Sequence, residues 1–265
     1  MKNVLTIAEN EFSMLARNPI VIIFGILMLV MAIINAAGFS SIVSDTNSSD
    51  HTGNLMAGIS NFFWNFSALF AFLAMCIGIT SVADERSKGS LRVLFGKPLY
   101  RRDVITGKFV GINLFMFLLI AFTLAIFISL MITLYAGPES IIDLSLRMLM
   151  FAVLLFINCS FTLGLVMCLG ILLNKSEALV ISLAFISFEW LTNIGSLPDS
   201  LGNLQLINPG YLYVYAMYMA SGKLLNGSVP LDSWLSGSLP YIVLMVAEVI
   251  LMVLVNCMLF NREEA

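Results

Sequence analysis

The sequence predicts an all-α integral membrane protein with six transmembrane helices, and three observations support this prediction. Of its 265 residues, 60% are hydrophobic and only 11% are charged, whereas soluble domains have about 45–50% apolar and about 25% charged residues. Apolar runs close to the length of about 20 residues that a spanning helix needs recur along the whole chain. The charged residues fall mainly between these runs, so we expect a single transmembrane domain, 1–265.

Each span is predicted from one apolar run and its borders. The six predicted spans are 19–39, 62–82, 104–135, 146–173, 178–194 and 236–260. The first lies within the charge-free stretch between Arg17 and Asp45, and Pro19 suits the first position of a helix. The third run is longer than the hydrocarbon layer is thick, so we expect it to tilt or to project from the membrane. The fifth and sixth runs each contain one carboxylate, Glu189 and Glu248.

Two segments outside the spans have their own predicted structure. Residues 1–18 place Val4, Ala8 and Leu15 on one face of a helix and polar residues on another, which predicts a helix at the membrane interface. Residues 196–235 are semi-apolar and interrupted by proline and glycine, which predicts short helices that re-enter the outer leaflet. A seventh span in this region is the alternative, and it would place the C-terminus outside.

Lysine and arginine are distributed unevenly between the two sides of the membrane that these spans define. Eleven of the thirteen lie on the side of both termini and of the connector 83–103, and the other side holds only Arg147 and Lys223. Because positively charged loops stay in the cytoplasm, we expect the connector and both termini there. The net charge of −3 gives no reason to expect nucleic acid as a partner.

Several functions are disfavoured by the motifs that the chain lacks. The Gly-Lys pairs at 96–97, 107–108 and 222–223 do not have the spacing GxxxxGK[ST] that cradles nucleotide phosphates. We therefore expect no nucleotide site, no bound cofactor and no enzymatic activity on this chain. His51 is the only histidine and lies outside the spans, which excludes His-based metal sites and Ser–His or Cys–His pairs within the membrane. The four cysteines have no CxxC spacing, so neither a disulfide framework nor a metal centre is expected.

The connector has an order of residue types that membrane orientation alone does not explain. Its polar start, 84–86, is followed by the interruption Lys88-Gly89-Ser90 and then by apolar residues on the aqueous side, namely Leu91, Val93, Leu94 and Phe95. A short amphipathic helix with exposed apolar residues between two spans is typical of a docking site for a soluble partner. The sequence therefore predicts that a soluble protein binds here.

These residues resemble the signature of the ABC-2-type permeases, the membrane subunits of many prokaryotic ABC exporters. The matching positions are Glu85, Arg86, Gly89, Ser90, Leu91, Leu94, Pro98, Leu99, Arg101, Asp103, Gly107, Lys108 and Gly111. The stretch 7–19 is similar to the interfacial helix of the family, with Glu11 and Arg17 at the matching places. Within the family, the chain looks most like the branch that includes the permease of nitrous-oxide-reductase maturation transporters.

The resemblance implies a multi-pass subunit of the prokaryotic plasma membrane that acts in export as a homodimer, with two copies of a separate ATPase subunit that binds ATP and Mg²⁺. It also allows an accessory periplasmic or extracellular protein as a partner. The connector would be the coupling helix, and its coupling residues would be Glu85, Arg86, Gly89, Ser90, Leu91, Leu94 and Arg101. Gly107 and Gly111 permit close helix packing, either within one subunit or between two.

Glu189 and Glu248 are the two carboxylates predicted inside the membrane. An ionised carboxylate at the bilayer centre costs about 2.5–3.5 kcal/mol on insertion scales, so each must be protonated, face a wet cavity or have a partner. The candidate partners by depth are Asn113, Asn158, Asn193 and Asn256. The two carboxylates either line a translocation pathway or hold helices together. The alternative function is a proton-coupled secondary transporter that uses Glu189 and Glu248.

Overall fold

The protein is described here by a computed structural model that covers residues 2–45, 51–83, 86, 101–135, 140–192, 206–218, 224–225 and 229–262. The regular structure within these residues is helical and contains no strand. Its elements are α1 (Lys2–Ala16), α2 (Pro19–Asp45), α3 (His51–Gly78), the π-helix η1 (Ile79–Ala83), α6 (Arg101–Tyr135), α7 (Ile141–Leu172), α8 (Lys175–Thr192), α10 (Pro209–Tyr218) and α11 (Leu231–Arg262). The predicted all-α class is confirmed for these residues.

Five of the described helices are long and apolar enough to cross a membrane, over Pro19–Ala37, Phe62–Ala83, Arg102–Thr133, Ile141–Leu172 and Leu231–Phe260. They correspond to the first, second, third, fourth and sixth predicted spans. The predicted fifth span, 178–194, falls on α8, which has 18 residues and contains Lys175, Glu177 and Glu189. Its length and charge keep α8 outside this group, so the count of six spans stays a prediction.

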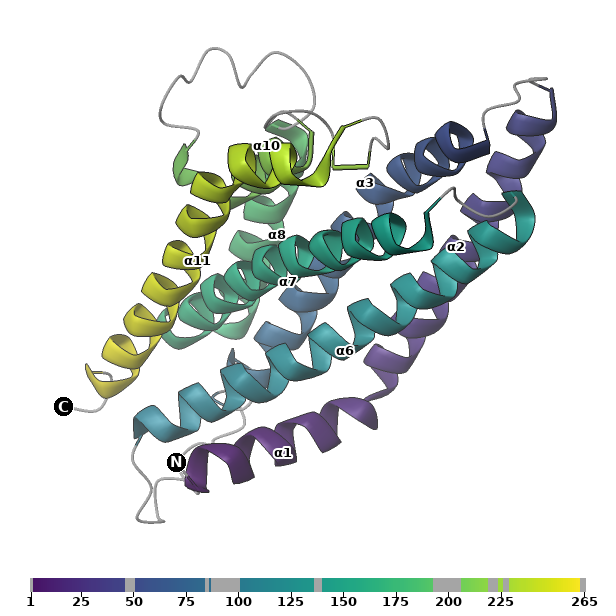
Figure 1. Ribbon diagram of the computed structural model, residues 1–265. Helices are drawn as coiled ribbons and strands as arrows, with labels where there is room; N and C mark the ends of the chain where they lie inside the picture. The colour runs from purple at the N-terminus through teal and green to yellow at the C-terminus, as the bar shows by residue number, and fades with distance from the viewer. Residues whose placement is uncertain are drawn as a thin grey trace.

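The two termini lie at the same end of the helix bundle (Figure 1). The long helices pack side by side, α6 starts at the end that holds the termini, and α10 lies at the opposite end beside the start of α11. The ten residues of α10 extend only about 15 Å as a helix. Helix α10 is a short element in the described part of 196–235, and the predicted re-entrant segment and its alternative, a seventh span, both stay predictions.

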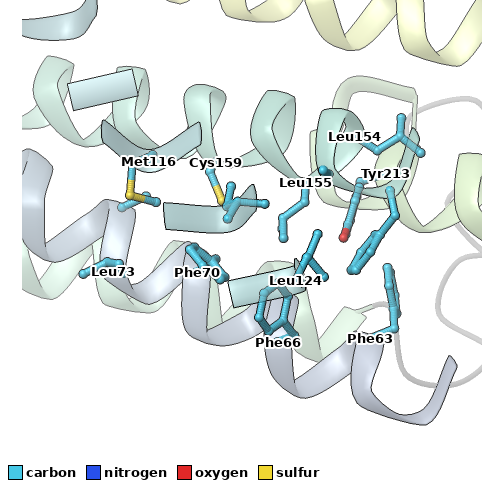
Figure 2. Close-up of a cluster of buried hydrophobic side chains, with 14 of the residues drawn as sticks. Phe63, Phe66, Phe70, Leu73, Met116, Leu124, Leu154, Leu155, Cys159 and Tyr213 are labelled. Atoms are coloured by element: carbon cyan, nitrogen blue, oxygen red, sulfur yellow. The ribbon is translucent and has the colours of Figure 1, made fainter. Parts of the chain in front are cut away.

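The core of the bundle lies between α3 and α7. In an apolar stretch of 18 residues taken from each helix, 72% of the residues of α3 and 67% of those of α7 are buried, compared with 22% for α2 and 11% for α11. Figure 2 shows Phe66 and Phe70 of α3 on the side that faces α7, with Tyr213 of α10 near Phe63 at one end of the cluster. The Phe63 and Tyr213 rings stack with their centroids 5.4 Å apart. The outward faces of α2 and α11 remain apolar because lipid chains, unlike water, accept such side chains without penalty.

α1 packs along the first turns of α6 and runs parallel to it. Gly107 contacts Ile7, Gly111 contacts Ala8, and the rings of Phe12 and Phe115 meet edge to face at 5.5 Å. The apolar face that the sequence predicted is the face that α1 buries, whereas its polar residues Thr6, Asn10, Ser13 and Arg17 are exposed. The two glycines therefore serve packing within one chain, which settles the alternative left open by their spacing.

The contact with α1 also explains why α6 is so long. At 1.5 Å per residue, its 35 residues extend about 52 Å, more than the hydrocarbon layer needs. α1 covers its first turns up to Phe115, and the part from Met116 to Tyr135 has the length of one span. This arrangement supports the predicted projection of the third helix beyond the membrane.

We expect Gly111→Ala to destabilise the protein. An added Cβ would lie 2.5 Å from the carbonyl oxygen and 2.8 Å from the Cα of Ala8, and these backbone atoms cannot move aside as a side chain can. Overpacking of this kind costs about 1–3 kcal/mol, so the melting temperature in detergent, followed by tryptophan fluorescence, should fall by several degrees. Gly25→Ala is the matched control, since no atom lies within 4 Å of its added Cβ. Equal melting temperatures for the two variants would contradict the α1–α6 contact.

Candidate functional site: the ends of the connector and a buried pair of carboxylates

The helix that leads into the connector ends in a π-helix. η1 spans Ile79–Ala83, and four of its five residues are buried. Its close neighbour is α7, where an added Cβ on Gly170 would lie 3.3 Å from the Cβ of Ala83. Single π-helical turns are rare and frequently occur at functional sites. The inner end of α3 is thus both irregular and tightly packed against α7.

Arg86 is the one predicted coupling residue whose side chain the structure describes. Its guanidinium Nη1 donates a hydrogen bond to the carbonyl oxygen of Ile171, in the last turn of α7. The last carbonyl groups of a helix have no partner within it, and a positive charge is favourable there. Arg86 therefore joins the start of the connector to the end of α7. This bond within the chain is separate from the predicted role of Arg86 in binding a partner protein.

Of the other predicted coupling residues, the structure describes only the backbone of one. Arg101 is the first residue of α6, and its backbone alone is described. The remaining ones, Glu85, Gly89, Ser90, Leu91 and Leu94, lie outside the described residues. Asp103 lies in the first turn of α6, where the sequence places it and where a negative charge is stabilising.

Lys108, which the orientation count includes among the connector-side cations, is buried. Its ammonium group donates to Glu11 Oε1 of α1, and the two side chains are 3% and 5% exposed. The sequence places both residues in family-like patterns but does not reveal that they contact each other. Lys108 therefore does not add an exposed positive charge to the connector side.

The structure places Glu189 and Glu248 within electrostatic range of each other, although 59 positions separate them in the sequence. Glu189 of α8 is 2% exposed, Glu248 of α11 is half-buried, and their charges are near enough to interact. Cys159 of α7 is also within electrostatic range of Glu189. The two helices that carry the carboxylates, α8 and α11, both pack against α7.

The first turn of α10 covers the carboxyl group of Glu189. An added Cβ on Gly210, the second residue of α10, would lie 2.6 Å from the Glu189 Cδ, so only glycine leaves room for the carboxyl group there. The N–H group of Gly210 itself donates to Asn208 Oδ1 at 3.1 Å, and the positive end of a helix dipole favours a nearby negative charge. The position of Glu189 at this helix end offers a physical reason for a carboxylate in an apolar region.

Two of the four candidate asparagine partners bind other groups. Asn113 accepts a hydrogen bond of 2.5 Å from Ser160, and Asn256 donates one of 2.8 Å to the carbonyl oxygen of Gly164. Both bonds join neighbouring helices. Asn158 is fully buried, and neither of its amide atoms has a hydrogen-bond partner among the described residues. Asn193 lies outside the described residues.

Arg147 has a structural role that the sequence analysis missed, because it was considered only as one of the two outer cations. It is 1% exposed and donates to Asp143 Oδ2 at 2.7 Å, to the carbonyl oxygen of Leu224 at 2.7 Å and to that of Val229 at 2.6 Å. The spacing of Asp143 and Arg147, one helical turn, was the available signal. This side chain holds the segment before α11 to the start of α7.

Two more hydrogen bonds attach α10 to its surroundings. The Tyr213 hydroxyl and Ser67 Oγ of α3 are 2.7 Å apart, and the Trp234 indole donates to the carbonyl oxygen of Ala216 at 2.8 Å. Tyr213 and Trp234 are fully buried. The interrupted region at this end is therefore anchored to α3, α7 and α11 where the structure describes it. In the same residues, no group of three or more His, Cys, Asp and Glu side chains could hold a metal ion.

The fold and these contacts define a polytopic helical membrane protein with polar contacts concentrated at its connector end and beneath α10. Residues 5–265, nearly the whole chain, match the family described as ABC-2 family transporter protein. The chain therefore belongs to the ABC-2 transporter family and is a membrane-embedded permease component of an ABC transporter. No curated protein matches the chain. The match is to the family as a whole, so the branch with the nitrous-oxide-reductase maturation permease stays a prediction.

Arg147→Met is expected to lower stability strongly. It removes a buried charge that three acceptors share, and the carbonyl oxygens of Leu224 and Val229 would lose this donor. Removing one partner of a buried charged contact costs about 3–5 kcal/mol, so the melting temperature and the yield of monodisperse protein should both fall. Lys175→Met, at an exposed cation of the opposite end, is the control. A melting temperature equal to that of the control would refute the anchoring role.

Proposed function

We propose that the chain is the permease subunit of an ATP-driven exporter, and that it works as a homodimer with two copies of a separate ATPase subunit. The family match over residues 5–265 carries this proposal. In support, this sequence has no nucleotide-binding loop of its own, so ATP and Mg²⁺ would bind to the partner subunit. The subunit would reside in a prokaryotic plasma membrane with both termini in the cytoplasm.

The connector is the proposed docking site for the ATPase. It lies in the sequence between η1 and α6, and both of these elements are firmly packed against the rest of the bundle, the first on α7 and the second on α1. A movement imposed on the connector would therefore reach the membrane helices directly. The proposed coupling residues remain Glu85, Arg86, Gly89, Ser90, Leu91, Leu94 and Arg101.

The region of Glu189 and Glu248 is the proposed polar part of the translocation pathway. Their proximity, the covering by α10 and the buried amide of Asn158 support a role beyond ordinary helix packing. Glu248 is half-buried on α11, the least enclosed of the spanning helices. In a homodimer, this face of α11 would be available to a second copy or to the cargo.

Proton-coupled secondary transport is the second candidate, and the proximity of the two carboxylates is the observation that favours it. Neighbouring carboxylates within a membrane are suited to proton relay. The two candidates differ in their energy source. ATP-driven transport requires an ATPase subunit and persists after a protonophore has abolished the proton gradient. Proton-coupled transport requires no ATPase subunit and stops when the gradient is abolished.

Reversing the charge of Glu85 or Arg101 is expected to weaken ATPase binding. Glu85→Lys and Arg101→Glu would place like charges against the docking groove, and charge pairs of this kind contribute severalfold to affinity. The measurement is the amount of ATPase subunit that co-purifies with the tagged permease, together with its ATP hydrolysis. Glu9→Lys changes an exposed residue of α1 by the same charge and should bind normally. Normal binding by all three variants argues against the connector as the docking site.

Replacing Glu189 and Glu248 by glutamine tests the role of the carboxylates. If they line the pathway, Glu189→Gln, Glu248→Gln and the double variant should insert normally and retain ATPase binding, but transport by the reconstituted complex should fall about tenfold or more, a size typical of functional polar contacts. Asn256→Leu removes a polar group that only joins helices, and it serves as the control. Full transport by the double variant would show that the carboxylates merely join helices.

A further inference from the structure

We propose that α1 and the inner third of α6 form one rigid unit, held by the Glu11–Lys108 ion pair, and that α1 passes the movement of the connector on by bending against α2 at residues 17–18. Glu11 and Lys108 would then be positioning residues for coupling. The inference rests on the proposed function, because it assumes that an ATPase moves the connector. Its evidence consists of four features of the α1–α6 contact and of the joint between α1 and α2.

The first feature is the shape of the contact. An added Cβ on Gly107 would lie 2.8 Å from the Cβ of Ile7 and 3.0 Å from the carbonyl oxygen of Val4, and one on Gly111 would meet the backbone of Ala8. The two helices thus touch almost backbone to backbone over one turn of each. Because the close neighbours there are backbone atoms and the stiff, β-branched side chain of Ile7, α1 cannot slide along α6 without losing the fit.

The second feature is a charge that has been removed from water. Glu11 and Lys108 are 4% and 3% exposed and form an ion pair on the same face as the glycines. A buried charge is tolerated only with its partner in place, so separation of α1 from α6 at this point would be unfavourable. The ion pair therefore fixes both the distance and the register of the two helices.

The third feature is the length of the contact. Beyond the ion pair, the rings of Phe12 and Phe115 pack edge to face at 5.5 Å, and Leu15 is 2% exposed. The contact with α6 consequently runs at least from Val4 to Phe12, more than half of α1. Contacts at both ends prevent α1 from pivoting on α6, which is what a rigid unit requires.

The fourth feature is the joint between α1 and α2, which is much less tightly packed than the contact between α1 and α6. The α1 helix ends at Ala16, and Asn18 caps α2, with its Oδ1 accepting from the Ile20 amide at 3.0 Å. Pro19 has no amide hydrogen to continue the hydrogen bonding of α1 into α2. α1 also contacts α2 far less than it contacts α6. Residues 17–18 are therefore the place where α1 can change its angle to α2.

The position of the unit in the chain connects it with the proposed function. Arg101 begins α6 directly after the connector, and Gly107 and Lys108 follow within about two turns. Any rotation of the inner end of α6 would therefore carry α1 with it. The family-like patterns at 7–19 and at 107–111, far apart in the sequence, would then be two halves of one contact.

The experiment measures distances between spin labels by double electron–electron resonance in the complex with its ATPase. One label pair, Ser13→Cys with Val110→Cys, reports on α1 and α6, and the second, Ser13→Cys with Ile26→Cys, on α1 and α2; all three positions are exposed. Cys76, Cys159, Cys168 and Cys257 are replaced by alanine. We expect trapping with Mg·ATP and vanadate to shift the α1–α2 distance and to leave the α1–α6 distance unchanged. A shifted α1–α6 distance, or an unchanged α1–α2 distance, overturns the proposal.

Variants of the ion pair test its part in the unit. Glu11→Gln and Lys108→Gln should each broaden the α1–α6 distance distribution, and the nucleotide-driven shift of the α1–α2 distance should be lost. The double change Glu11→Leu with Lys108→Met removes both charges and should restore the narrow distribution, because an apolar pair can replace a buried ion pair. Glu9→Gln, on the exposed face of α1, is the matched control. An unchanged distribution in both single variants overturns the role of the ion pair.

Co-purification and vanadate-sensitive ATP hydrolysis keep this test separate from that of the proposed function. If no ATPase subunit binds the wild-type chain, the proposed function is wrong. If one binds and hydrolyses ATP while α1 moves away from α6, the proposed function stands and the rigid unit is wrong. A cross-linked variant, Phe12→Cys with Phe115→Cys, supports the same distinction, because a covalent bond within a rigid unit should leave hydrolysis and the α1–α2 shift intact.

Discussion

The hydrocarbon layer contains no water that could hydrogen-bond to polar groups, and the structure depends on this constraint more than on any single contact. Backbone groups in such a layer must find partners within their own segment, and helices provide them. The same requirement applies to polar side chains. Asn256 donates to the carbonyl oxygen of Gly164, Ser160 donates to Asn113, and the hydroxyls of Tyr213 and Ser67 share a hydrogen bond. In each case the polar group also joins two helices.

Charged side chains are accommodated in three different ways. Glu11 and Lys108 neutralise each other between α1 and α6, and Arg147 is surrounded by one carboxylate and two backbone carbonyl groups. Glu189 lies against the first turn of α10, with Glu248 nearby. The first two arrangements satisfy the charge fully and are suited to holding the structure together. The third places two carboxyl groups within electrostatic range of each other, an arrangement that differs from the pairing of opposite charges in the first two.

The two ends of the connector are attached to different parts of the bundle. On one side, η1 packs against α7, and Arg86 binds the last turn of that helix. On the other side, α6 carries α1. A force applied to the connector would thus act on the central pair α3 and α7 and on the peripheral pair α6 and α1 at once. At η1 and at residues 17–18 the helical hydrogen bonding changes its pattern, and both lie at the ends of these units.

The sequence by itself determined the properties that depend on composition and local spacing. The long apolar runs are helices, α2 begins at Pro19 as predicted, and the amphipathic pattern of residues 4–15 identified the face that α1 buries. These features follow from rules that act within a few helical turns. The family-like signature around 85–111 likewise pointed to the family that the comparison then showed.

Only the tertiary structure decided which distant residues meet. The spacing of Gly107 and Gly111 allowed close packing but could not name α1 as the neighbour, and nothing in the pattern paired Lys108 with Glu11. Depth along a helix suggested asparagine partners for the carboxylates, yet Asn113 and Asn256 bind other groups, because depth does not specify which side of a helix a residue faces. Likewise, nothing in the sequence indicated that Glu189 lies against α10 and within electrostatic range of Glu248. Contacts between helices depend on their rotation and relative position, and those follow from the packing of the whole bundle.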